Sequence, residues 1–216
     1  MGQITFIRHG QASHGAADYD KLSPLGHQQS DWLGQYLRAS EQRFDRVVCG
    51  TLRRHRETLA GIQSSLNHPT VSEDARLNEM SFFPMAIAYE QVFGALPAAP
   101  EAAEENFVRV MQAWVKGDIP DAPESYGEFS ARILAAVNEI AASDDHVLVV
   151  SSGGVKGVAV RQALGLDLLG MTQIILRTYN ASISRFSQTP RGFQLMQFNL
   201  VPHLESPTRR HALTYL

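Results

Sequence analysis

Three segments of the sequence place arginine, histidine or serine side chains soon after short apolar runs. Arg8 and His9 follow the run ITFI, Arg54 comes shortly after RVVC, and Ser152 comes just after VLVV. The planar guanidinium group of arginine binds phosphate oxygens through paired hydrogen bonds, and a neutral imidazole can attack phosphorus. These residue types therefore indicate phosphoryl transfer through a phosphohistidine, with His9 as the candidate nucleophile.

The stretch VLVVSSGGVK, residues 147–156, predicts a buried strand that turns tightly into a helix. Backbone N–H groups at such a turn point toward whatever lies above it and favour an anion there. We therefore expect Ser152 and Gly153 to lie beside a bound phosphate.

Strand and helix patterns alternate along most of the chain. The expected strands are residues 4–7, 46–49 and 147–150, and residues 182–188 and 193–199 predict a hairpin. The expected helices begin at Pro24 after an N-cap at Ser23, near Thr51, and at residues 129 and 154. This order predicts an α/β fold, a three-layer sandwich with a mostly parallel sheet. In such sheets ligands bind beyond the carboxyl ends of the strands, where the residues above would meet.

The chain length fits one domain, residues 1–216. Residues from about 84 to 120 carry four prolines around the helical stretch EENFVRVMQAWV. This segment is expected to be a helical insertion over the main sheet.

The composition limits the classes of partner. A net charge of −3 offers no general attraction to nucleic acid or to an anionic membrane, so an anion site must be local. The chain has no long apolar run, and its single cysteine, Cys49, is expected to be a buried residue at a strand end in a reducing compartment. We therefore expect a cytoplasmic protein. No His, Cys, Asp or Glu cluster has metal-ligand spacing, so neither a metal nor another cofactor is expected.

Five motifs extend this interpretation. They are FIRHGQ (6–11), LSPLGHQQ (22–29), GTLRRHRETL (50–59), RLNEM (76–80) and VVSSGG (149–154). In this order they resemble the histidine phosphatase superfamily, the phosphoglycerate mutase-like proteins. The resemblance implies that His9 is the phosphorylated nucleophile, that Arg8 and Arg54 hold the phosphate, and that Glu79 donates a proton to the leaving group. It also implies that Gln11 and Ser23 line the pocket.

The sequence departs from this family at Ser152, where a second histidine is usual. A serine donates one neutral hydrogen bond, whereas an imidazolium donates a cationic one. Losing one preorganised donor costs a rate factor of roughly a hundred to a thousand. We therefore interpret Ser152 as a weakened substitute and expect Ser152→His to raise turnover. The residues after Glu79 and the pair Lys156-Gly157 also differ from the family pattern.

Three functions fit these residues. The first is a phosphomonoester hydrolase, the second a weakly active pseudophosphatase that binds a phosphorylated small molecule or protein, and the third a phosphoglycerate mutase. The departures after Glu79 count against the mutase.

Structural roles are the alternative for several of these residues. Ser23 is also explained as an N-cap, Gln11 as a polar loop residue, and Glu79 as a surface carboxylate. Arg53 and Arg56 are expected to be solvated. His55 falls within an apolar helical stripe and is expected to be a core or supporting histidine.

Overall fold

The computed structural model describes residues 2–13, 19–66 and 69–215. The described residues form a six-stranded sheet in the order β3-β2-β4-β1-β5-β6. The strands are β1 (Gln3–Arg8), β2 (Arg46–Cys49), β3 (Thr70–Glu73), β4 (His146–Ser151), β5 (Ile183–Thr189) and β6 (Gly192–Leu200). Neighbouring strands from β3 to β1 are parallel, whereas β5 is antiparallel to both β1 and β6. The predicted mostly parallel sheet and the predicted hairpin are confirmed.

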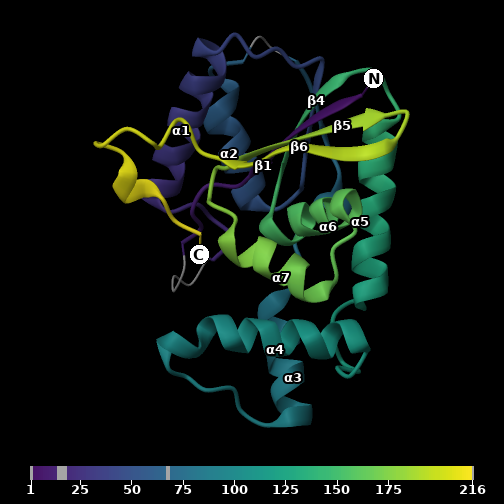
Figure 1. Cartoon of the computed structure of the whole chain (residues 1–216). Coiled ribbons are helices and arrows are strands. Elements are labelled where there is room, and N and C mark those ends of the chain that lie inside the picture. The colour runs from purple at the N-terminus through teal and green to yellow at the C-terminus, as the bar shows by residue number, and fades with distance from the viewer. Residues whose placement is uncertain (1, 14–18, 67–68, 216) are drawn as a thin grey trace.

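Helices cover both faces of the sheet (Figure 1). The pair α1 (Pro24–Ala39) and α2 (Arg53–Gln63) packs on one face, and α5 (Tyr126–Ala141) and α6 (Gly153–Leu164) lie on the other. The side chains of β4 divide between these layers. Val147 and Val149 belong to the core under α5 and α6, and Leu148 and Val150 belong to the core under α1 and α2. The three-layer α/β sandwich is therefore the observed architecture.

Local capping explains where two of these helices begin. The Ser23 hydroxyl accepts a hydrogen bond from the Gly26 amide at 3.0 Å, and Pro24 occupies the first position of α1, as predicted. Helix α5 begins three residues before the predicted start. Its N-cap, Ser125, forms a capping box with Glu128, in which each side chain bonds the other residue's backbone amide.

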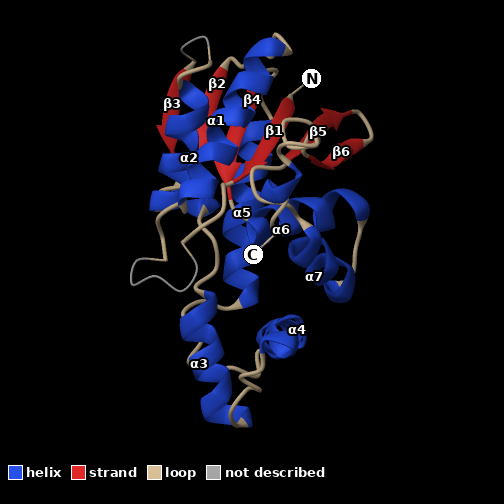
Figure 2. Ribbon diagram, turned by 90° about the vertical axis from the view of Figure 1, so that its left-hand side faces the viewer, coloured by secondary structure: helices blue, strands red, loops and turns tan. Residues whose placement is uncertain are grey.

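The region from residue 84 to 120 does not lie over a sheet face. Two helices, α3 (Phe82–Phe93) and α4 (Ala103–Lys116), occupy it, and both lie beyond the carboxyl ends of the parallel strands (Figures 1 and 2). Apolar side chains of α4, including Trp114, join the core that contains Phe129 of α5. The segment therefore lies beyond the ends of the strands, and the apolar face of α4 packs mainly against helices.

One strand and two α-helices were not predicted. Strand β3 is exposed along all four residues, so it carries no apolar alternation. Helix α3 has Pro84 in its first turn, where proline is tolerated because the first amides have no partner within the helix. Helix α7 (Leu168–Arg177) follows α6 closely, and its Asp167 cap accepts from the Gly170 amide. Within the described residues no helix has the length and apolar character needed to cross a membrane.

Candidate active site

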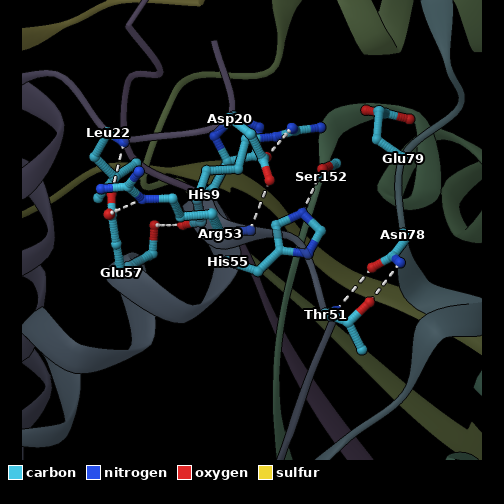
Figure 3. Close-up of polar contacts among 12 residues, drawn as sticks. His9, Asp20, Leu22, Thr51, Arg53, His55, Glu57, Asn78, Glu79 and Ser152 are labelled. Atoms are coloured by element: carbon cyan, nitrogen blue, oxygen red, sulfur yellow. Dashed lines mark hydrogen bonds and ion pairs between the residues drawn. The ribbon is translucent and has the colours of Figure 1, made fainter. Parts of the chain in front are cut away.

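The carboxyl ends of three parallel strands bring the predicted residues together. Arg8 of β1 is in register with Ser151 of β4, and the His9 amide donates to the Ser151 carbonyl oxygen at 2.8 Å. His9 and Ser152, the residues that directly follow these two strands, therefore lie side by side. Strand β2 pairs with the other edge of β4 and leads into α2, whose first turn carries Arg54. Figure 3 shows His9, Ser152, His55 and Glu79 gathered at this edge.

His9 is a buried neutral imidazole. Its Nδ1 lies 2.7 Å from the Gly10 carbonyl oxygen, which can only accept, so Nδ1 carries the proton. Burial lowers the pKa of His9 well below its usual value, and the neighbouring Arg54, Arg8 and His55 lower it further. The ring is therefore neutral near pH 7, with a lone pair on Nε2. This is the form of histidine that can act as a nucleophile.

Arg8 and Arg54 supply buried positive charge beside His9. Only 8% of Arg8 and 7% of Arg54 is exposed, and among the described residues neither Nε has a hydrogen-bond partner. Burial lowers the pKa of Arg8 to about 10, an effect that the charge of Glu79 partly offsets. Arg8 therefore stays charged at neutral pH. Two buried cations with unused Nε donors have the charge and the hydrogen-bonding capacity that an anion such as phosphate requires.

The other two arginines of the RRHR run lie at the surface. The side chains of Arg53 and Arg56 are each 54% exposed and pair with Glu57 and Glu73, which confirms that they are solvated. Arg54 instead turns inward, where its Nη1 donates to Asp20 at 2.5 Å.

Glu79 lies at the N-terminus of α6. Its Oε2 accepts from the Gly154 amide at 2.8 Å, and its Oε1 accepts from the Met80 amide at 3.1 Å. The Gly154 amide at this turn is thus bonded to Glu79. A Cβ at Gly153 would lie 3.4 Å from Nε of Arg8, so the turn lies beside the cationic site. Glu79 is therefore part of this cluster rather than an isolated surface carboxylate.

Gln11 and Ser23 lie together, but both take part in the scaffold. The Ser23 hydroxyl donates to Oε1 of Gln11 at 2.7 Å while it caps α1. The Gln11 amide donates to Gln29 at 2.8 Å. These bonds attach the loop that carries His9 to the start of α1, so the structure supports the N-cap role of Ser23.

Ser152 and His55 form a buried pair. Neither side chain is exposed, and the Ser152 hydroxyl lies 2.6 Å from Nε2 of His55. The ring of His55 is 5.8 Å from that of His9 between centroids. Burial, followed by Arg54, lowers the pKa of His55 well below its usual value, so the ring is neutral near pH 7. His55 is a buried histidine as predicted, and its contact with Ser152 was not foreseen.

Lys156 is also buried, and its Nζ donates to the carbonyl oxygen and to the hydroxyl of Ser182, each at 3.0 Å. The same carbonyl oxygen accepts the Arg8 amide. Burial, and then the charge of Arg8, lowers the pKa of Lys156. Lys156, at which the sequence differs from the family pattern, therefore places its amine close to the end of β1, the strand that carries Arg8.

Sequence reasoning missed two residues that support the site. Asp20 pairs with Arg54, and the Thr58 hydroxyl accepts from the Gly10 amide at 3.0 Å and donates to the Arg54 carbonyl oxygen at 2.7 Å. Thr58 lies four residues after Arg54 on α2, a spacing that could have indicated it. No local signal connects Asp20 with Arg54, because 34 residues separate them.

Cys49 is buried as predicted, and burial raises the pKa of its thiol to about 12. It is therefore a core residue rather than a nucleophile. The described residues contain no group of three or more His, Cys, Asp or Glu side chains that could hold a metal ion. Independence from metals remains a prediction.

Comparisons with known proteins identify the family and the fold. The family model of the histidine phosphatase superfamily (branch 1) matches residues 4–201. No curated protein gives a significant match. Similar solved structures include an α-ribazole phosphatase from Shigella flexneri, with 21% identity, a TM-score of 0.65 and coverage of 92% of this chain and 96% of that one.

Two further solved structures have the same fold. A mutant of the phosphoserine phosphatase from Entamoeba histolytica, in complex with phosphoserine, has 17% identity and a TM-score of 0.67, with coverage of 94% of this chain and all of that one. A phosphoglycerate mutase from Bacillus anthracis str. Sterne has 18% identity and a TM-score of 0.68, with 94% of each chain covered. At these identities the structures establish a shared fold and leave the substrate open.

Proposed function

Because the chain belongs to the histidine phosphatase superfamily, a family of phosphatases and mutases, we propose that it is a phosphomonoester hydrolase that works through a phosphohistidine on His9. The observation that carries this proposal is the arrangement of Arg8 and Arg54 around His9. Two buried guanidinium groups with unused Nε donors lie beside a neutral imidazole whose Nε2 lone pair is available. A phosphoryl group satisfies all of these groups at once.

In the first step, the Nε2 lone pair of His9 attacks phosphorus in line with the ester oxygen. The N–P bond forms while the P–O bond to the leaving group breaks. Arg8 and Arg54 neutralise the charge on the equatorial oxygens. Glu79, in its protonated form, transfers its proton to the departing oxygen, so the organic product leaves as an alcohol.

In the second step, water attacks the phosphohistidine. Glu79, now a carboxylate, accepts a proton from this water, and the N–P bond breaks as inorganic phosphate forms. His9 and Glu79 return to their starting states, so no cofactor is consumed. The substrate is a phosphorylated small molecule or a phosphoprotein that presents a phosphomonoester.

Trapping the phosphoenzyme tests this mechanism. After rapid quench with labelled p-nitrophenyl phosphate, we expect acid-labile, base-stable phosphate on His9. His9→Ala should show no label, and its kcat should fall by roughly a thousandfold or more, because the nucleophile is lost. His203→Leu is a matched control, because it removes another buried histidine that is not part of this site. Turnover that persists in His9→Ala without trapped phosphate would refute the mechanism.

The same experiment separates the alternative functions. A hydrolase releases inorganic phosphate, whereas a mutase returns the label to an alcohol acceptor. A protein that binds inorganic phosphate but releases none from a panel of phosphomonoesters would be a pseudophosphatase.

A further inference from the structure

Ser152 is the N-cap of α6, but its side chain does not cap the helix. An N-cap serine usually accepts a hydrogen bond from an amide of the first turn, and the Ser152 hydroxyl accepts none there. Instead its Oγ lies 2.6 Å from Nε2 of His55. The serine hydroxyl at the edge of the phosphate site is therefore held by an imidazole that comes from α2.

The fold makes room for this imidazole. A Cβ at Gly50 would lie 2.2 Å from Nδ1 of His55, so only glycine at that position leaves space for the ring. Among the described residues no group meets the geometry of a hydrogen bond to Nδ1, although the Gly50 backbone beside it acts to raise the pKa of the ring, so burying this ring costs stability that an apolar side chain would not lose. The side-chain hydrogen bond of this ring is made by Nε2, which faces Ser152.

We propose that His55 is a positioning residue that orients and polarises the Ser152 hydroxyl toward a bound phosphoryl group, so that the pair replaces a histidine donor at position 152. This inference rests on the proposed function. His55 does not touch the substrate and acts through Ser152.

The direction of the two hydrogen bonds follows from the proton count. A serine hydroxyl has one proton, and beside an anionic phosphoryl oxygen that proton must point at the oxygen. The contact with His55 is then formed by Nε2–H donating to Oγ. Two hydrogen bonds that run in the same direction polarise one another, which strengthens the donor that faces phosphate.

The location supports a role in turnover. The ring of His55 lies 5.8 Å from the ring of His9, and Gly153, the residue after Ser152, lies against Arg8. In Figure 3 the His55 ring points at Ser152 from below the His9 side chain. The pair is thus adjacent to both the nucleophile and one of the two cations.

Kinetics of paired variants test the proposal. With p-nitrophenyl phosphate we expect His55→Leu and Ser152→Ala each to lower kcat by about tenfold to a hundredfold, the scale of one hydrogen bond to a charged group. KM should change much less. The double variant should lose no more than either single variant, because the two residues act as one unit. His55→Gln keeps an N–H donor in this position and should recover most of the lost kcat.

His203→Leu is the matched control for the loss of a buried histidine and should leave kcat unchanged. A kcat in His55→Leu within twofold of the wild type would overturn the proposal. So would multiplicative losses in the double variant, or a His55→Gln variant that folds but is no more active than His55→Leu.

A second measurement is independent of turnover. Nitrogen-15 spectra of the histidine rings, recorded while inorganic phosphate is added, should show Nε2 of His55 protonated in the bound state. An Nε2 that stays unprotonated would overturn the proposal even if the wild type hydrolyses phosphomonoesters. If the wild type hydrolyses no phosphomonoester, yet Nε2 of His55 becomes protonated when phosphate binds, the proposed hydrolase activity is refuted. The proposed role of the His55–Ser152 pair is then still supported.

Discussion

The contact between Ser152 and His55 changes the interpretation of Ser152, which stands where the family usually has a second histidine. From sequence alone, Ser152 is a weaker donor in an otherwise intact phosphate site. The structure places an imidazole against its hydroxyl, with both side chains fully buried. A residue that is a poor donor alone gains strength from a neighbour contributed by another helix.

This contact reverses the expected result of Ser152→His. A second imidazole at position 152 has no room, because Nε2 of His55 lies 2.6 Å from Oγ of Ser152. We expect Ser152→His alone to lower the free energy of unfolding by about 1–3 kcal/mol through overpacking, and to reduce kcat/KM. Adding His55→Ala should restore both, because it vacates the space. Urea unfolding and p-nitrophenyl phosphate kinetics on the three proteins check this. A single variant that gains activity would show that the pocket can expand.

The elements around the site meet through close backbone contacts. A Cβ at Gly10 would lie 2.4 Å from the Gly26 carbonyl oxygen, and a Cβ at Gly26 would lie 2.1 Å from the Gln11 carbonyl oxygen. The loop after β1 and the first turn of α1 therefore touch along their backbones. This contact fixes the loop that holds His9 against the helix that begins at Ser23.

Gly26→Ala should separate these two elements. The clash involves backbone, which cannot rotate away, so we expect a loss of roughly 1–3 kcal/mol in the free energy of unfolding and a marked fall in kcat. Gly127→Ala, also in the first turn of a helix, is the control. A Cβ there meets only the Ser125 hydroxyl, at 3.8 Å, so this variant should be neutral or slightly stabilised. Equal effects of the two substitutions would contradict the contact.

The molecule as a whole buries several basic groups in neutral form. Burial lowers the pKa of His9 and His55 well below the usual value, and burial together with Arg209 lowers the pKa of His203 to about 3. In the unfolded chain each of these histidines has a pKa near 6.5. The unfolded state therefore binds more protons than the folded state below that pH.

The stability of the protein should thus be full above about pH 6.5 and fall as the pH drops below it. Each such histidine contributes up to about 1.4 kcal/mol per pH unit, because one more proton is bound on unfolding. His203→Leu should remove one of these protons and flatten the pH dependence between about pH 6 and pH 4, while activity at pH 7 stays unchanged. Urea unfolding at several pH values measures how the free energy of unfolding changes with pH in the wild type and in His203→Leu. Identical slopes would mean that His203 is protonated in the folded state.

Local features of the sequence determined much of the architecture. Apolar runs predicted β1, β2 and β4, the Ser23-Pro24 pair predicted the start of α1, and the order of elements predicted the three layers. The side chains that follow the strands were also predicted to meet. Each of these inferences depends on neighbours in the sequence and on a general rule of parallel sheets, so no further contact had to be known.

Only the tertiary structure decided how those side chains are partnered. Asp20 reaches Arg54, Glu79 takes the Gly154 amide, and His55 takes the Ser152 hydroxyl across 97 residues of sequence. The insertion likewise lies beyond the strands because α4 packs on helices. Such contacts join residues that are distant along the chain. They depend on how whole helices and strands pack. The spacing of residues along the sequence does not indicate which side chains this packing brings within hydrogen-bond distance.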